Sequence, residues 1–376
     1  MPAADPAVAG NGESNDFKDR ISRSAIRLLA DELAAVGEEF PAERFVELAG
    51  RGLEGLELKA RVVHVADALA EALPADFPAA AEVLDRALDA HSLDGWIVYP
   101  VDDYVARYGI DHPEIGLPLI ERLTRLWSCE FAIRPFIETH PGITFEYFDR
   151  WVESDDEHLR RLVSEGSRPR LPWATNLDAF IEDPAPDIAL LDRLVDDRSP
   201  YVRRSVSNHL NDIARDHPEL AIETGRRWLE EGGETDRRKW IVTRGMRSLV
   251  KQGDPAALAL LGYDPEAPVE ISGFALEPGA VGIGEPITIE FALSADQPTP
   301  VMVDYLVHHA GANGTRSPKV FKLKKAELEP GVERRFIKQH RFRQVSTRRI
   351  YPGPHLVEVQ VNGRVLASAA VEVRAA

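Results

Sequence analysis

Apolar residues recur at spacings of three and four from Phe17 to about Gly262, which is the pattern of amphipathic helices. One stripe runs through Ile21, Ala25, Leu28, Leu29 and Leu33, and another through Val62, Val65, Ala66, Leu69 and Leu73. The predicted helices are short, because clusters of Pro, Gly and Asp such as His140-Pro141-Gly142 interrupt the pattern. This punctuation predicts pairs of helices joined by tight turns.

A weak internal repeat places similar residues 43 positions apart. Phe148–Val152 followed by Glu157–Val163 parallels Leu191–Val195 followed by Pro200–Val206, and a third copy starts near Asp236. A period near 40 residues with two helices per unit is typical of HEAT-like repeats, which stack into a curved solenoid with a concave binding surface. We predict an α-helical HEAT-like repeat solenoid over residues 17–264, preceded by a disordered lead over residues 1–16.

Near Pro265 the pattern changes to short runs in which apolar and polar residues alternate roughly. Seven such runs are Val269–Ile271, Ile287–Leu293, Val301–Val307, Phe321–Lys324, Arg334–Lys338, His355–Val361 and Val365–Val373. Asn362-Gly363, between the last two runs, is a strong signal for a two-residue hairpin turn. Seven short strands in this length predict an immunoglobulin-like β-sandwich over residues 267–376.

The formal net charge of -17 argues at face value against a nucleic acid partner. The charge is uneven, however: residues 267–376 hold 14 basic and 11 acidic side chains, and Arg316–Arg349 holds 12 basic and three acidic ones. Because salt screens exposed charges beyond about 8 to 10 Å, a local basic stripe can bind phosphate on an acidic protein. Net charge therefore does not decide whether the partner is DNA.

Several common kinds of site are excluded by composition and motif. Cys129 is the single cysteine, so the chain has no intrachain disulfide and no cysteine-rich zinc site, which suits a reducing cytoplasm. No apolar run approaches the ~20 residues of a membrane span. The sequence contains no phosphate-binding loop, no HExxH motif and no Gly-x-Ser-x-Gly elbow. We expect a soluble cytoplasmic protein that uses no cofactor, nucleotide or metal.

Three carboxylates are placed where stacked helix pairs could bring them together. Glu165 follows Arg161 by four residues, and Arg204, Asn208 and Asp212 share one helix face. Glu130 precedes the apolar segment Phe131–Ile137. In a solenoid, Glu130, Glu165 and Asp212 can converge on the concave wall. The alternative for each is an ordinary ion pair with nearby arginines.

The segment Leu162–Trp173 breaks a helical pattern with two prolines. Pro172 restricts the approach to Trp173 and leaves the indole little freedom. Trp173 is a candidate site residue, and its alternative is a core aromatic at the helix junction. Trp240, beside Arg238 and Lys239, is interpreted as a core residue.

These segments resemble the AlkC branch of the AlkD-like, HEAT-repeat alkylpurine DNA glycosylases. The resemblance is carried by Glu130–Ile137 (EFAIRPFI), Trp151–Trp173 (WVESDDEHLRRLVSEGSRPRLPW) and Tyr201–Pro218 (YVRRSVSNHLNDIARDHP). It extends over the chain, because one form of this branch has an immunoglobulin-like domain after its helical repeats. The N-terminal hundred residues match less distinctively.

The resemblance implies a monofunctional DNA glycosylase of base excision repair that releases cationic 3-methyladenine and 3-methylcytosine from duplex DNA without flipping the base. It implies that Glu130, Glu165 and Asp212 are the catalytic acids and that Trp173 lies beside the lesion. An N3-alkylated base leaves as a neutral molecule, so positive charge grows on the sugar, as in glycoside hydrolysis. Carboxylates can stabilise that charge and position or deprotonate water.

Double-stranded DNA containing alkylated bases is the expected partner of a monomeric protein. The predicted contacts in the repeats are Arg160, Arg161, Arg168, Arg170, Arg203, Arg204, Asn208, Arg238 and Lys239. Those in the β-sandwich are Lys319, Lys322, Lys324, Lys325, Lys338, Arg341, Arg343, Arg348 and Arg349, with a solvated strand face as the alternative. Two rival interpretations are a non-catalytic HEAT-repeat scaffold and a DNA-binding relative that has lost activity.

Overall fold

The computed structural model describes residues 16–37, 39–90, 93, 95–232, 236–311, 316–344 and 349–375. The chain forms two compact units. The first comprises Met1–Asp216 with Glu234–Ile241, and the second comprises His217–Gly233 with Val242–Ala376. Of the predicted lead over residues 1–16, only Asp16 lies within the described residues.

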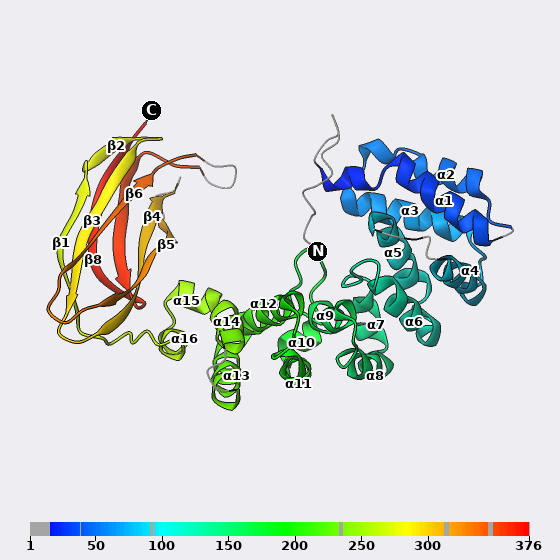
Figure 1. Ribbon diagram of the computed structural model, residues 1–376. Helices are drawn as coiled ribbons and strands as arrows, with labels where there is room; N and C mark the ends of the chain where they lie inside the picture. Colours follow the sequence, from blue (N-terminus) through cyan, green and yellow to red (C-terminus); the bar gives the residue numbers. More distant parts are fainter. Residues whose placement is uncertain are drawn as a thin grey trace. The chain divides into compact units, whose positions relative to one another are not determined.

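The first unit is built from helices (Figure 1). Its α-helices are α1 (Arg23–Val36), α2 (Ala42–Gly50), α3 (Leu58–Ala72), α4 (Phe77–Asp89), α5 (Val98–Tyr108), α6 (Pro113–Thr124), α7 (Ile133–Thr139), α8 (Pro141–Trp151), α9 (Glu157–Gly166), α10 (Asp178–Glu182), α11 (Ala185–Leu194), α12 (Pro200–Asp216) and the start of α14 (Asp236–Gly245). In the described ranges, the 3-10 turn η1 (Phe17–Arg20) precedes α1, η2 (Leu53–Gly55) lies between α2 and α3, and η3 (Gly95–Ile97) lies between α4 and α5.

Local sequence fixes where these helices begin. Ser22, Asp76 and Asp156 cap α1, α4 and α9, each accepting a backbone N–H within the first turn. Helices α6 and α8 begin at a proline, whose missing N–H costs nothing at that position. The antiparallel pairs α8–α9 and α11–α12 correspond to the two clearest sequence repeats, so the prediction of HEAT-like helix pairs is confirmed.

The second unit contains helices as well as the β-sandwich. Its helices are α13 (Pro218–Glu231), the end of α14, α15 (Arg247–Gln252) and α16 (Pro255–Leu260). Asn362 connects the two parts, because its side-chain amide donates to the carbonyls of Asp264 at 2.9 Å and Pro300 at 3.2 Å. The compact unit therefore begins before residue 267, and the domain limits taken from the sequence remain a prediction. No helix in the described ranges is both long and apolar enough to span a membrane.

Eight strands form two sheets (Figure 1). The strands are β1 (Val269–Glu277), β2 (Ala280–Gly282), β3 (Pro286–Ala295), β4 (Thr299–Ala310), β5 (Arg316–Leu328), β6 (Arg334–Arg341), β7 (Gly353–Val361) and β8 (Arg364–Arg374). One sheet has the order β1-β3-β6, and the other has the order β2-β8-β7-β4-β5. The sequence pattern predicts seven of these strands and misses β2, which has only three residues and pairs in parallel with β8.

Alternating apolar residues from the two sheets form the core of the sandwich. Ile289 and Phe291 on β3 and Val303 on β4 are almost fully buried within it. The predicted hairpin is present: Val361 pairs with Arg364, and both Asn362 and Gly363 have positive φ, as a type I′ turn requires. The immunoglobulin-like fold class is therefore confirmed.

Candidate active site

The three predicted acids come together in the first unit. Glu130 lies in the segment between α6 and α7, Glu165 lies in the last turn of α9, and Asp212 lies on α12. Their residues are 5%, 8% and 8% exposed. Burial of three carboxylates requires compensating partners, because an unpaired buried charge is costly.

Two arginines supply that compensation and link the acids into one row. Arg161 Nη1 lies 3.0 Å from Glu130 Oε2, and Arg161 Nη2 lies 3.6 Å from Glu165 Oε1. Arg168 Nη1 donates to Glu165 Oε1 at 2.7 Å, while its Nε and Nη2 donate to both oxygens of Asp212 at 2.7 and 3.2 Å. We call Glu130, Arg161, Glu165, Arg168 and Asp212 the ion-pair row. With all five side chains ionised, it carries one more negative charge than positive charges.

The acids of the row differ in basicity. Burial alone would raise the pKa of Glu165, but Arg161 and Arg168, together with a 2.6 Å hydrogen bond from Ser205, lower it to about 2. The pKa of Asp212 is instead raised above its usual value, because the effect of burial outweighs the opposing effect of Arg168. Glu165 therefore stays ionised, whereas Asp212 is the more basic of these two carboxylates.

The apolar segment Phe131–Ile137 contains one arginine, Arg134, which has a structural role beside the ion-pair row. Its guanidinium is buried and donates to the carbonyls of Gly166 and Arg168 at 2.8 Å each and of Thr175 at 2.6 Å. Burial lowers the pKa of Arg134 to about 10. Arg134 thus fixes the backbone that leaves α9 and carries Arg168 and Trp173. The sequence offered one signal for it, a lone cation in an apolar run.

Trp173 is displayed at the surface instead of packed in the core. It is 63% exposed, so its interpretation as a core aromatic at the helix junction is wrong. Its φ of 69° is in the left-handed region, which is a strained conformation for a bulky side chain. Backbone strain of this kind concentrates at functional sites, and here it holds the indole at a pocket that Glu130 also lines.

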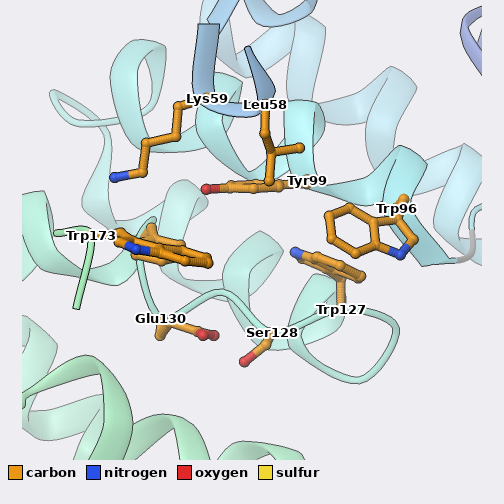
Figure 2. Close-up of a pocket in the computed structure, with 9 residues that line it drawn as sticks. Leu58, Lys59, Trp96, Tyr99, Trp127, Ser128, Glu130 and Trp173 are labelled. Atoms are coloured by element: carbon orange, nitrogen blue, oxygen red, sulfur yellow. The ribbon is translucent and has the colours of Figure 1, made fainter. Parts of the chain in front are cut away.

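A pocket beside Glu130 is lined by aromatic rings that sequence reasoning missed (Figure 2). Its lining residues are Leu58, Lys59, Trp96, Tyr99, Trp127, Ser128, Glu130, Phe131 and Trp173. The rings of Trp96 and Trp127 are 4.8 Å apart, and that of Tyr99 lies 5.9 Å from those of Trp127 and Phe131. Figure 2 shows the Glu130 carboxylate below these rings, on the side of Ser128. No sequence spacing indicated this pocket, because its walls come from helices α3 and α5 and from the segments between other helices.

Five arginines predicted to contact DNA have carboxylate partners inside the protein. Besides Arg161 and Arg168 of the ion-pair row, Arg160 is buried and lies 2.6 Å from Asp197, and Arg170 lies 2.6 Å from Asp216. Arg238 pairs with Asp196 in the same way. Because these guanidiniums build the helical unit, we do not propose them as the main phosphate ligands.

Exposed residues remain on two other surfaces. Arg204 and Lys239 are exposed, Asn208 is half-buried, and Arg203 donates to the backbone carbonyls of Asp197 and Arg198. Trp240 is 44% exposed, so its interpretation as a core residue is wrong.

In the β-sandwich, the exposed predicted cations are Lys319, Lys322, Lys324 and Lys325 on β5, Lys338 and Arg341 on β6, and Arg343 and Arg349 beyond it. Arg348 lies outside the described residues.

Within the part of the chain that the structure describes, no group of three or more His, Cys, Asp or Glu residues is arranged to hold a metal ion. The chemistry that the ion-pair row can perform is electrostatic. It can stabilise positive charge close to Glu130, Glu165 and Asp212, and a carboxylate of raised pKa can accept a proton from water.

Comparison with known proteins gives matches over nearly the whole chain. Residues 270–375 match the family model described as the C-terminal Ig-like domain of the uncharacterised protein YhaZ. The uncharacterized protein YhaZ of Bacillus subtilis (strain 168) is 34% identical over 352 residues, which are 93% of this chain and 97% of that protein. The structure of the Pseudomonas fluorescens alkylpurine DNA glycosylase AlkC, bound to DNA containing an abasic site analog, is 36% identical with a TM-score of 0.86. That match covers 96% of this chain and 99% of the AlkC chain.

Proposed function

Since this chain belongs to the AlkC family of alkylpurine DNA glycosylases, we propose that it hydrolyses the N-glycosidic bond of cationic alkylated bases in duplex DNA. One observation carries the proposal: Glu130, Glu165 and Asp212, far apart in sequence, meet in a buried row with excess negative charge beside an exposed, strained tryptophan. The expected substrates are 3-methyladenine and 3-methylcytosine, whose bases carry a formal positive charge.

The excess charge of the ion-pair row suits the transition state of this reaction. As the bond between C1′ and the base lengthens, the positive charge moves from the base to C1′ and the ring oxygen, and the base leaves neutral. A general acid contributes little, because the leaving group needs no proton. Carboxylates held in place by Arg161 and Arg168 need no rearrangement as the charge develops, which is the condition for efficient electrostatic stabilisation.

The difference between Glu165 and Asp212 suggests a division of roles. With a pKa of about 2, Glu165 is a poor base near neutral pH but a permanent negative charge. Asp212 has a raised pKa and is therefore the better acceptor for the proton of the attacking water. We assign Glu165 to stabilisation of the sugar cation and Asp212 to activation of water.

Trp173 and the aromatic pocket would interact with the lesion from the solvent side of the row. An indole face attracts a cationic base or sugar by about 0.5 to 2 kcal/mol. The exposed position of Trp173 allows this contact without extrusion of the base. We propose that the lesion stays within the duplex and that lability and charge, instead of base edges, provide selectivity.

Phosphates would be held by exposed cations. Arg204 and Lys239 are the candidates in the first unit, and Lys322, Lys324 and Lys325 are the main ones in the β-sandwich. These contacts carry no sequence information, as suits an enzyme that finds damage in any context. The protein would act as a monomer in the cytoplasm, where it meets DNA.

The test is release of free base from methylated duplex DNA by the purified protein, with and without a chelator. We expect 3-methyladenine and 3-methylcytosine to be released equally in both conditions, leaving intact abasic sites. No release above background at large enzyme excess would favour the scaffold or inactive-relative interpretation.

Asp212→Asn tests the assignment of the general base. The amide keeps the shape of the side chain but accepts no proton from water, so we expect the single-turnover rate to fall by at least about 100-fold. DNA binding, measured on abasic duplex, should stay within about threefold. Equal losses of rate and binding would mean that Asp212 has only a structural role.

A further inference from the structure

A buried histidine and aspartate lie beneath the ion-pair row. His209 is on α12, one helical turn before Asp212 and one turn after Ser205. Asp187 is on α11, and both residues are 0% exposed. The mechanism proposed above uses neither of them, and no sequence motif indicated them.

One ring nitrogen of His209 must carry a proton. Its Nδ1 lies 2.9 Å from the backbone carbonyl oxygen of Ser164 on α9. A carbonyl oxygen only accepts hydrogen bonds, so the imidazole must be the donor at Nδ1. This bond ties α12 to α9 at the residue that precedes Glu165.

The other ring nitrogen faces the aspartate. His209 Nε2 lies 3.2 Å from Asp187 Oδ2. If the imidazole is neutral with its proton on Nδ1 and the carboxylate is ionised, the lone pair of Nε2 faces a lone pair of Oδ2. This arrangement is unfavourable in a buried site. One proton on the pair removes this opposition, either as imidazolium with carboxylate or as imidazole with carboxylic acid. Nε2 and Oδ2 lie at contact distance without the alignment of a hydrogen bond, so the lone-pair argument, and not an observed bond, places the proton on the pair. Burial raises the pKa of Asp187, with His209 opposing the shift, which is consistent with a shared proton.

The same pair acts indirectly on two of the three carboxylates of the row, Glu165 and Asp212. Ser205 Oγ donates to Glu165 Oε2 at 2.6 Å and lies 2.9 Å from Ser164 Oγ, so the His209 bond to Ser164 supports the group that orients Glu165. The charged groups that interact with the pair are Arg134, which acts on Asp187, and Asp212, on which His209 acts. Positive charge on His209 would oppose the effect of burial on Asp212.

We propose that His209 and Asp187 form a proton-sharing pair that positions Glu165 and Asp212 relative to each other. The pair is a positioning element and contacts neither DNA nor the reacting atoms. The effect of the pair on catalysis rests on the proposed glycosylase function. The shared proton does not depend on that function.

Two substitutions separate the parts of this proposal. His209→Phe removes both ring nitrogens, and we expect the rate of base release at saturating enzyme to fall by at least about 30-fold while abasic-duplex binding stays within about threefold. Asp187→Asn keeps a donor toward Nε2, so we expect it to retain the rate within about fivefold. Thr144→Val is the matched control, because the buried Thr144 hydroxyl bonds the carbonyls of Phe136 and His140 away from the row.

Each outcome decides one point. A His209→Phe rate no lower than that of the control, corrected for the folded fraction from thermal unfolding, would overturn the positioning role. If Asp187→Asn releases base as slowly as His209→Phe does, the pair of neutral imidazole and carboxylic acid is ruled out. The pair must then be an imidazolium with a carboxylate.

Nuclear magnetic resonance of the ¹⁵N-histidine-labelled full chain tests the proton without relying on activity. We expect one imidazole with a protonated Nδ1 and an Nε2 signal displaced from that of an unprotonated ring nitrogen, and both signals should vanish in His209→Phe. An Nε2 signal at the position of an unprotonated nitrogen would overturn the shared proton even if the enzyme is active. Conversely, a displaced Nε2 signal in a protein that releases no base would support the pair and refute only the glycosylase function.

Discussion

Three arginines of the helical unit and two lysines of the β-sandwich occupy opposite environments. Arg160, Arg161 and Arg168 are buried and face carboxylates at 2.6 to 3.0 Å. Lys322 and Lys324 are exposed on β5, at the edge of their sheet. Arg161 and Arg168 set the position and charge of the proposed catalytic acids, whereas the exposed lysines can contact phosphates.

The largest effect should follow removal of a buried cation. Arg168→Met leaves Asp212 without its guanidinium and Glu165 with only Arg161. Breaking a buried ion pair costs about 3 to 5 kcal/mol, and we expect the rate of base release to fall roughly 100-fold. Denaturant unfolding and single-turnover kinetics measure the two effects.

Arg170→Met is the matched control for that substitution. Arg170 pairs with Asp216 outside the row and is partly exposed, so we expect less than about 1 kcal/mol of lost stability and little change in rate. Similar losses in both variants would contradict the distinction between arginines that build the site and those that do not.

Substitution of Trp173 tests whether an exposed side chain of the helical unit contributes to base release. Trp173→Gly removes the ring and relieves a positive φ, a strain worth about 1 to 2 kcal/mol. We expect base release to slow about tenfold while the free energy of unfolding does not fall. Trp240→Gly, at an exposed helical position, should instead lose about 1 kcal/mol. Lost stability without lost activity in Trp173→Gly would make the indole structural.

The exposed lysines should affect binding more than chemistry. Changing Lys322, Lys324 and Lys325 to Gln should weaken binding to duplex DNA several-fold and reduce the salt slope by about 0.9 for each phosphate that is no longer neutralised. Neutralising Arg44 and Arg51, exposed on and beside α2, provides the control. An unchanged slope would support the alternative that these lysines lie on a solvated strand face.

The smallest effect concerns acid stability. Because the pKa of Glu165 is about 2 in the folded chain and 4.5 in its unperturbed state, its ionised form stabilises the fold above about pH 4.5. That contribution is lost as the pH falls toward 2. We therefore expect the difference in free energy of unfolding between the parent and Glu165→Gln to narrow over this range.

The Arg168→Met background gives the control for the pH experiment. Arg168 is one cause of the lowered pKa of Glu165, so the narrowing should be smaller when it is absent. A narrowing of the same size in both backgrounds would mean that Arg168 does not set the ionisation of Glu165.

Local pattern was sufficient for most of the fold. Spacings of three and four predicted the helices, alternation predicted seven strands, and Asn362-Gly363 predicted the last hairpin. Strand β2 could not be predicted from the sequence, because its three residues show no alternation and its partner strand, β8, is distant in sequence. The aromatic pocket was missed for a related reason, since Trp96 and Tyr99 meet Trp127 and Trp173, which are about 30 and 75 positions further along the chain.

The sequence by itself determined the order of helical repeats and β-sandwich and the family, since these depend on local periodicity and distinctive motifs, and it proposed three acids as site residues. Only the tertiary structure decided what surrounds the acids. It directed Arg161 and Arg168 inward to them, displayed Trp173 outward and placed His209 against Asp187 beneath the row. The physical reason is that burial and pairing, which set the charge and basicity of a side chain, depend on residues about 30 to 45 positions away in the chain.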